Sequence, residues 1–238
     1  MLDRDKERKI NWGYLIPLVG TLTLGCSNVG FVIAGNNQVG GILSQKLDWG
    51  DSETRNNTAI ASAGVSGLIL GSFAIEPIRR WIGGRKSIML TSLTCILAVI
   101  PTVIVNLAAI LIGKFILGLA SGAMIVACSL YLNETVPVEH ASTFGFTTNF
   151  GVICGIMLCL VMGVALPDPK TDPQACDDNT FWIYMNAFPA LIGALNLVLW
   201  LFVFKYESVK TYVVKSSSAP SNAQIGSPDS GTSKDGSA

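Results

Sequence analysis

The stretch from Leu107 to Leu160 constrains the fold more than any other part of the chain. It consists of a long apolar segment, a short charged elbow (NETVPVEHAS, residues 133–142) and a second long apolar segment. A helix that crosses a bilayer needs about 20 predominantly apolar residues, and each segment meets that length. Only 13% of the whole chain is charged, against about 25% in soluble domains. The sequence therefore predicts an integral membrane protein.

The same length criterion predicts an all-α fold of six transmembrane helices. The motif RRWIGGRK (79–86) predicts a tight polar turn between the second and third helices, and Asn106 alone separates the third from the fourth. We therefore expect those two helices to form an antiparallel hairpin. The predicted spans are approximately 12–35, 57–78, 87–105, 107–132, 143–166 and 181–204.

The distribution of lysine and arginine predicts the orientation in the membrane. Cytoplasmic loops carry an excess of these residues, and here twelve lie on one side of the spans against three on the other. Both termini are therefore expected in the cytoplasm, and the two groups of three spans would form inverted repeats. The twelve are Arg4, Lys6, Arg8, Lys9, Arg79, Arg80, Arg85, Lys86, Lys205, Lys210, Lys215 and Lys234, and the three are Lys46, Arg55 and Lys170.

The chain divides into one membrane domain with short flanking segments. Residues 1–11 form a charged leader, which we expect in the cytoplasm, and residues 12–212 form the six-helix membrane domain. Residues 213–238 are expected to be a disordered cytoplasmic tail, because from Ser216 onward the sequence is rich in Ser, Gly and Pro and has no apolar face to bury. A solvated end without function is favoured over a phosphorylated docking segment.

Small residues spaced four apart predict where the helices pack closely, since transmembrane helices associate through close van der Waals contact. In the first span, by contrast, glycines recur every five residues and drift around the helix, which indicates general close packing or a helix that bends. The four-residue stripes are Ala63, Gly67 and Gly71, then Gly118 and Gly122, then Gly151 and Gly155.

Two polar side chains interrupt the apolar segments around the elbow. Asn149 lies in the fifth span, where it could form an interhelical hydrogen bond or face a polar, uncharged ligand. Lys114 lies in the outer part of the fourth span, where its side chain could snorkel to the interface. A proton relay needs a titratable group near the midplane. The one acidic residue within a span, Glu76, lies a turn from the basic loop, so we expect passive movement of a neutral solute.

Several functions are disfavoured by composition and spacing. The formal net charge is zero, so nucleic acid is not expected as a partner. Five of the six cysteines lie inside apolar runs and their spacing matches no zinc pattern, so neither a metal nor a cofactor is expected. His140 stands beside Glu139 without a nucleophile arrangement, and we do not expect an enzyme.

Five short motifs, in order, resemble those of the sugar porters (glucose-transporter-like proteins) of the major facilitator superfamily. The fourth-span segment GKFILGLASG (113–122) resembles Gly-Arg-Phe-x-x-Gly-x-x-x-Gly, and the elbow residues Tyr131, Glu134 and Pro137 resemble Tyr-x-x-Glu-x-x-Pro. GFTTNFGVICG (145–155) is similar to the fifth-helix segment that carries a sugar-binding glutamine. The remaining two are GGRK (83–86), similar to the Gly-Arg-Arg turn, and YESVK (206–210), similar to Pro-Glu-Ser-Pro-Arg.

The resemblance implies two sets of functional residues. The implied substrate-binding residues are Asn149, Val152, Ile156 and Asn28. The implied gating and charge network, which in the family latches two halves together, comprises Arg85, Lys86, Lys114, Glu134, Glu207 and Lys210. Glu134 and Glu207 are expected to pair with Arg85, Lys86 or Lys210.

The sequence also departs from the family pattern at several of these positions. Arg79 and Arg80 stand where the family carries an acid, and Ala141 replaces an arginine. Asn149 is one methylene shorter than the family's glutamine. Asn28 lies near the family's Tyr-Asp or Tyr-Asn pair, and the family's proton-coupling aspartate is absent. Only part of the latch is therefore expected to form.

The family has twelve helices, and this chain resembles only the N-terminal six. The resemblance implies a facilitative carrier for a hexose or similar neutral polyol that works by alternating access in the lipid bilayer. Such a half would need to form a homodimer or to pair with a separate C-terminal half. The alternatives are a transport-inactive half that serves as a membrane scaffold or complex subunit, and a truncated product of a full-length carrier. We expect the plasma membrane as its location, with an organelle membrane as the alternative.

Overall fold

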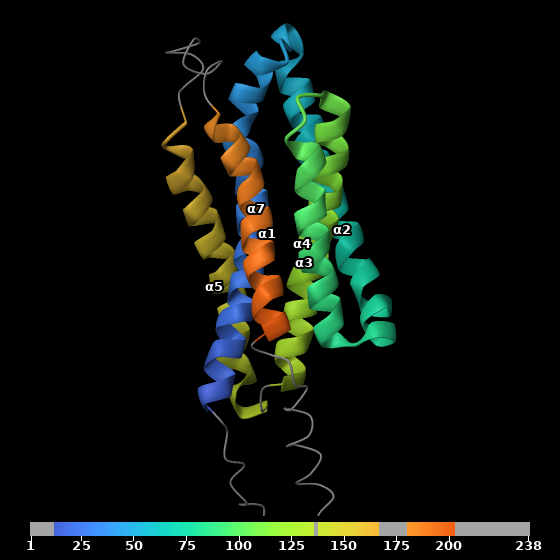
Figure 1. Cartoon of the computed structure of the whole chain (residues 1–238), viewed down its shortest axis with the longest axis vertical. Coiled ribbons are helices and arrows are strands. Elements are labelled where there is room, and N and C mark those ends of the chain that lie inside the picture. The colour runs from blue at the N-terminus through green and yellow to red at the C-terminus, as the bar shows by residue number, and fades with distance from the viewer. Residues whose placement is uncertain (1–11, 136–137, 167–179, 203–238) are drawn as a thin grey trace, which may run out of the picture. The chain divides into compact units, whose positions relative to one another are not determined.

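The computed structural model describes residues 12–135, 138–166 and 180–202, and the side chains within them except those of 12–14 and 138–144. Six α-helices account for nearly all of this part of the chain (Figure 1). Each is long and apolar enough to cross a membrane, so the predicted all-α architecture with six spans is confirmed. The helices are α1 Trp12–Lys46, α2 Glu53–Ile82, α3 Gly84–Thr102, α4 Leu107–Thr135, α5 Val138–Gly163 and α7 Phe181–Phe202, with a short 3-10 helix at Gly50–Ser52.

Several helix ends differ from the predicted spans. The first helix continues eleven residues past its predicted end at residue 35, to Lys46. The segment after residue 35 begins with the polar and glycine-containing sequence NNQVGG (36–41). It contains no proline that would end the helix. The third helix ends at Thr102, so a four-residue turn rather than Asn106 alone separates α3 from α4. Within that turn the side chain of Asn106 accepts a hydrogen bond from the backbone N–H of Ala108 and caps α4. The predicted leader and tail lie outside the described residues.

The predicted turn between α2 and α3 is set by Gly83. Its φ of 90° and ψ of 159° form a backbone conformation that only glycine adopts readily. Its N–H donates to the carbonyl of Arg79 at 2.8 Å and closes the last turn of α2. The chain then reverses directly into α3, which keeps both arginine-rich ends on the same side of the bundle.

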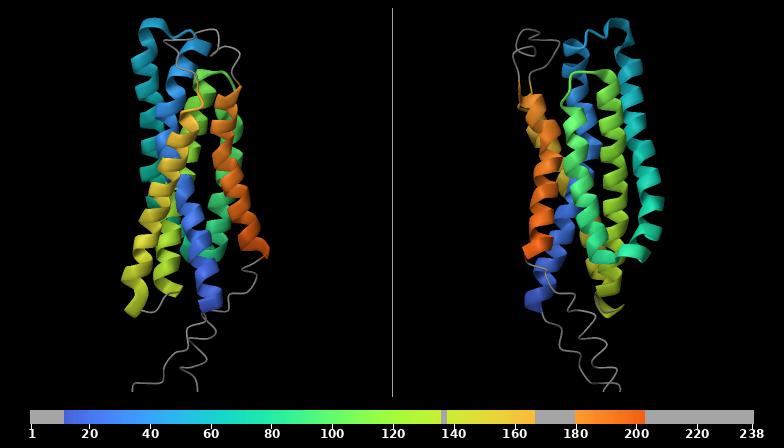
Figure 2. Two further views of the ribbon diagram at one scale, coloured as in Figure 1. Left: turned by 90° about the vertical axis from the view of Figure 1, so that its left-hand side faces the viewer. Right: turned by 45° about the vertical axis from the view of Figure 1, so that its right-hand side comes forward.

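The helices pair across the two halves of the sequence. α1 packs along α5, and α2 packs along α4, so the first helix of each group of three contacts the second helix of the other group. Figure 1 shows α1, α5 and α7 together on the left and α2, α3 and α4 together on the right, and the turned views of Figure 2 agree. Each group of three thus contacts the other in the same way, through its first helix, as expected for inverted three-helix repeats.

Glycines allow both of these helix pairs to approach at backbone distance. A Cβ atom added to Gly155 would lie 1.8 Å from the carbonyl oxygen of Ser27 on α1, and one added to Gly30 would lie 1.9 Å from that of Val152 on α5. The equivalent distances at Gly71 and Gly122, between α2 and α4, are both 2.0 Å. The predicted glycine stripes are therefore helix contacts. The glycines of α1 face different neighbours in turn, since Gly25 lies against α4 and α7 and Gly40 against Asn57 of α2.

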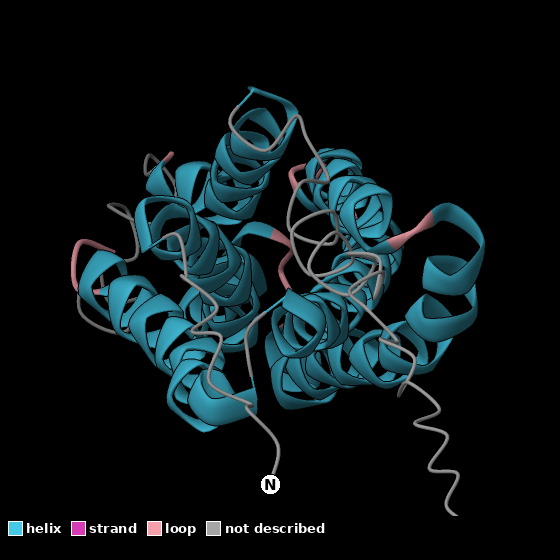
Figure 3. Cartoon of the chain, turned by 90° about the horizontal axis from the view of Figure 1, so that it is seen from below, coloured by secondary structure: helices cyan, strands magenta, loops and turns pink. Residues whose placement is uncertain are grey.

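Apolar side chains fill the centre of the bundle and also cover much of its outside. Three clusters of buried apolar side chains follow one another along the bundle, and Trp200, Phe31 and Leu117 are fully buried members, one from each. Many large apolar residues are exposed, among them Phe73 on α2 and Val161 on α5. The end-on view in Figure 3 shows the helices packed side by side without a covering layer of further helices. Such an outer surface suits hydrocarbon rather than water.

Candidate functional site

The three predicted site residues of α5 lie on one side of that helix. Asn149, Val152 and Ile156 are spaced three and four residues apart, which aligns them on a helical face. Asn149 is exposed, whereas Val152 and Ile156 are half-buried and pack against the two larger core clusters. The amide of Asn149 therefore lies at the margin of the α1–α5 contact, with its polar atoms outside the core.

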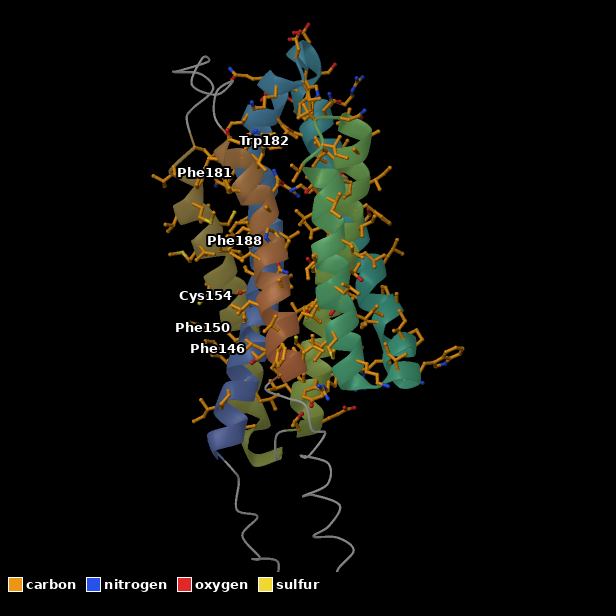
Figure 4. The ribbon with its side chains drawn as sticks, in the orientation of Figure 1. Phe146, Phe150, Cys154, Phe181, Trp182 and Phe188 are labelled. Atoms are coloured by element: carbon orange, nitrogen blue, oxygen red, sulfur yellow. The ribbon has the colours of Figure 1, made fainter. Side chains whose placement is uncertain are left out.

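Glycines hold this face of α5 in place against α1. Gly151 and Gly155 alternate with the site residues, and a Cβ on Gly151 would lie 2.6 Å from the carbonyl oxygen of Thr23. Thr148, directly before Asn149, is buried. On the exposed side of α5, Phe146 and Phe150 stack with ring centroids 6.4 Å apart, and Cys154 lies one turn beyond them (Figure 4).

Asn28, the fourth predicted substrate-binding residue, does not share this surface. Its side chain is 1% exposed, and its Nδ2 donates to the carbonyl oxygen of Pro189 on α7 at 3.2 Å. The structure thus places Asn28 in a buried contact between α1 and α7, whereas Asn149 is exposed on α5. The sequence could not indicate this contact, because it does not give the register of α1 against α7, and the substrate-binding role of Asn28 stays a prediction.

A second buried asparagine, Asn196 on α7, was missed by the sequence analysis. It is fully buried, its Nδ2 donates to the carbonyl oxygen of Thr21 at 2.9 Å, and its Oδ1 accepts from the hydroxyl of Ser92 at 3.2 Å. One amide therefore joins α1, α3 and α7. The signal that singled out Asn149, an amide inside an apolar span, applies equally to Asn196 and would have found it.

Lys114 lies inside the bundle rather than at its surface. Its side chain is 7% exposed, and Nζ donates to Oδ1 of Asn186 on α7 at 3.0 Å. The amide of Asn186 is held in turn by its own donation to the carbonyl of Trp182 at 3.0 Å. The prediction that Lys114 could snorkel to the interface is wrong, because the side chain points inward to a polar partner. Two small cavities, of about 10 and 20 Å³, border this pair.

The charged residues at the opposite end of the bundle pair differently from expectation. Glu134 at the end of α4 forms an ion pair with Arg79 of α2, with Oε1 and Nη1 2.6 Å apart. Arg85 donates to the backbone carbonyl of Trp200 in the last turn of α7 at 2.9 Å, where a cation also complements the helix dipole. Lys86 is exposed. Glu207 and Lys210 lie outside the described residues.

Arg79 is therefore a functional candidate that the sequence analysis noted only as a departure from the family pattern. The neighbouring Arg80 pairs with Glu76 on its own helix at 2.6 Å. Lys114 lies twenty residues before Glu134 on α4, about 30 Å along the helix axis. Of the predicted network residues that the structure describes, Arg85, Lys86 and Glu134 thus lie at one end of the bundle. Lys114 lies toward the other end.

The described residues contain no group of three or more His, Cys, Asp or Glu side chains placed to hold a metal ion. Within the same part of the chain, Cys26, Cys95, Cys128, Cys154 and Cys159 are free thiols. The candidate residues supply amides, hydroxyls, one lysine and apolar side chains, which can bind a ligand by hydrogen bonds and shape.

A family model described as "Sugar (and other) transporter" matches residues 19–220. Hexose transporter 1 of Toxoplasma gondii is 25% identical over 174 residues, which cover 71% of this chain and 30% of that protein. The probable plastidic glucose transporter 2 of Arabidopsis thaliana is 24% identical over 214 residues, covering 85% of this chain and 42% of that protein. These relatives bear the names of transporters, and the chain spans less than half of their length.

Among solved structures, the major facilitator superfamily proton:xylose symporter XylE, bound to 6-bromo-6-deoxy-D-glucose, has a similar fold. The TM-score is 0.73 at 15% sequence identity, and the alignment covers 87% of this chain and 48% of that one. At this level of identity the likeness shows that the six helices share the fold of one half of such a protein.

Proposed function

Because the chain belongs to the sugar (and other) transporter family of the major facilitator superfamily, we propose that it forms one half of a facilitative carrier for a hexose or a similar neutral polyol. The resemblance predicted from the five motifs is thereby confirmed. In the proposed mechanism the solute binds between this half and a second one, and the two halves rock about the bound solute to give alternating access. The second half is a second copy of this chain or a separate C-terminal half.

The observation that carries this proposal is the exposed amide of Asn149 on an otherwise uncharged helix face. An amide both donates and accepts hydrogen bonds, which matches the hydroxyl groups of a sugar. The half-buried side chains of Val152 and Ile156 beside it offer apolar surface to the ring carbons. The described residues 145–166 include no charged side chain, which favours a neutral solute over an ionic one.

The close approach of the backbones of α1 to α5 and of α2 to α4 supports movement of the six helices as one rigid unit. Gly30 and Gly155 leave no room for a side chain between α1 and α5, and Gly71 and Gly122 leave none between α2 and α4. Helices packed at this distance resist sliding past one another, since protein interiors do not deform continuously. We therefore propose that the whole six-helix unit tilts, rather than one helix bending within it.

The orientation and location proposed for the chain rest on its charge distribution. Arg79, Arg80, Arg85 and Lys86 gather where α2 ends and α3 begins, at the same end as the start of α1 (Figure 1). Placing this end in the cytoplasm satisfies the excess of positive charge there. The proposed location is the plasma membrane.

Sugar flux into proteoliposomes tests the proposal. The reconstituted full chain should show saturable uptake of labelled glucose, and Asn149→Ala should reduce uptake by roughly tenfold if one hydrogen bond of about 1.4 kcal/mol is lost. Asn149→Gln should retain most of the uptake, because it keeps the amide. Cys154→Ala provides the control for an exposed position on another face of α5. Uptake no greater than in empty liposomes, for the chain alone and with a co-reconstituted second half, would refute the proposal.

A transport-inactive scaffold is the second candidate, and the Arg79–Glu134 ion pair favours it. The resemblance assigns Glu134 to a latch with another half, whereas here its carboxylate is engaged by an arginine of its own chain. Purification from native membranes in mild detergent distinguishes the two candidates. A stoichiometric partner unrelated to sugar carriers would support the scaffold, and a homodimer or a carrier half would argue against it. A messenger RNA that continues into a second half would instead identify a truncated product.

A further inference from the structure

A cavity between five helices is lined by one polar side chain from each of them. It has a volume of about 20 Å³ and lies at the end of the bundle that holds the α3–α4 turn. The rest of its lining is apolar or glycine, for example Val39 and Ile110. The five polar residues are Asn36 of α1, Asn57 of α2, Thr102 of α3, Lys114 of α4 and Asn186 of α7.

The lysine in this cavity has no counter-charge among the described residues. Lys114 is 7% exposed, and the ion pairs in the described part of the chain, Arg79–Glu134 and Arg80–Glu76, lie at the other end of the bundle. Its hydrogen bond to Asn186 supplies a dipole but no charge. Burying an ammonium group without an opposite charge costs free energy. The arrangement therefore favours binding of an anionic ligand.

The amides around the cavity can supply further donors to such a ligand. Oδ1 of Asn36 is buried and accepts no hydrogen bond within the described part of the chain. Because the oxygen and nitrogen of an asparagine amide exchange places by a simple rotation, Asn36 can direct its NH₂ group into the cavity without loss. The amide of Asn57 lines the same space. The hydroxyl of Thr102, by contrast, donates its hydrogen to the carbonyl oxygen of Val99 at 2.6 Å and is not available as a donor to the ligand.

We propose that this cavity is a binding site for a small monovalent inorganic anion of the halide class. The anion is held by Nζ of Lys114 and by the NH₂ group of Asn36 or Asn57. A cavity of about 20 Å³ accommodates a ligand of about the size of one water molecule, which suits chloride. α5, which carries Asn149, contributes no residue to its lining, so this site is separate from the proposed sugar site and does not depend on it.

Thermal unfolding of the purified full chain in detergent tests the proposal. The melting temperature is measured in sodium chloride, sodium bromide and sodium gluconate at equal ionic strength, since gluconate is a much larger anion than either halide. The Tm should be higher in either halide than in gluconate by roughly 2–4 °C, because a ligand that binds the folded state stabilises it. Lys114→Met should abolish this difference. Lys46→Met should preserve it, because Lys46 lies over the ring of Trp182 at 6.0 Å and outside the cavity lining.

A second variant decides the matter even if Lys114→Met does not fold. Asn186→Asp places a carboxylate where Oδ1 now lies 3.0 Å from Nζ of Lys114, and so provides a permanent counter-charge. This variant should unfold at the same temperature in all three salts. Equal melting temperatures of the unsubstituted protein in chloride and gluconate would overturn the proposal and would indicate a neutral lysine or a water molecule in the cavity. A halide effect that persists in Lys114→Met or in Asn186→Asp would overturn it as well.

Discussion

The guanidinium of Arg79 lies 2.6 Å from the carboxylate of Glu134 and so joins the end of α2 to the end of α4. These two helices already touch through Gly67, Gly71, Gly118 and Gly122. The ion pair therefore adds a polar contact to a pair of helices that close packing holds together. It also satisfies, within one chain, an acid that the family resemblance assigns to a contact between two halves.

Breaking this ion pair should have a small effect on stability. Arg79→Gln should lower the free energy of unfolding by about 0.2–1 kcal/mol, because the carboxylate of Glu134 is 42% exposed and solvent screens the pair. The matched control is Arg80→Gln, whose ion pair with Glu76 is more exposed and lies within one helix, so its effect should be smaller still. Unfolding in detergent at low and high salt measures both changes. A loss at Arg79 that is insensitive to salt would contradict an electrostatic origin.

The contact between α1 and α5 should not tolerate a side chain at Gly155. Gly155→Ala places a methyl group 1.8 Å from the carbonyl oxygen of Ser27, so the helices must separate. The expected cost is about 1–3 kcal/mol or more, read from the melting temperature and from the yield of folded protein. Gly145→Ala on the same helix is the control, since a Cβ there meets nothing within 4 Å, and replacing a helical glycine by alanine alone is favourable. Equal behaviour of the two variants would show that α5 packs elsewhere.

The hydrogen bonds of the Asn196 amide, which connect α7 to α1 and α3, should contribute measurably to the free energy of unfolding. Asn196→Ala removes the hydrogen bonds with Thr21 and Ser92, and interhelical hydrogen bonds in membranes are worth about 0.6 kcal/mol each, so the loss should be about 1–2 kcal/mol. Ser92→Ala removes one of the two bonds and should cost less. Ser66→Ala serves as the control, because its exposed hydroxyl bonds only to its own helix. A Ser92 variant less stable than the Asn196 variant would contradict this arrangement.

The turn after α2 should require glycine at position 83. Gly83→Ala forces a Cβ onto a residue with φ of 90°, at a cost of roughly 1–3 kcal/mol. No atom lies within 4 Å of that Cβ, so the cost would come from the backbone alone. Gly20→Ala also meets open space but lies within helix α1, and it should be neutral or slightly stabilising. Circular dichroism with thermal unfolding separates the two outcomes, and a neutral Gly83→Ala variant would show that the turn adopts another conformation.

The sequence by itself determined the class of the protein and the positions of its helices. Six apolar segments of sufficient length define the spans, because hydrocarbon admits only backbone whose hydrogen bonds are made internally. The turn at Gly83 and the glycine stripes of α2, α4 and α5 were equally visible, since each depends on a local pattern. The order of short motifs identified the family, although single motifs among them are weak.

Only the tertiary structure decided which helices pair and which polar groups meet. Asn28 and Pro189 are 161 residues apart in sequence, and Lys114 and Asn186 are 72 apart. Helices that are apolar on nearly every side carry no periodic signal that tells a neighbour-facing side from a lipid-facing one. The contact of Asn28 with Pro189 and the pairing of Glu134 with Arg79 join helices of different repeats. The direction of Lys114 depends on α7 of its own repeat. All three bring together side chains that no local pattern connects.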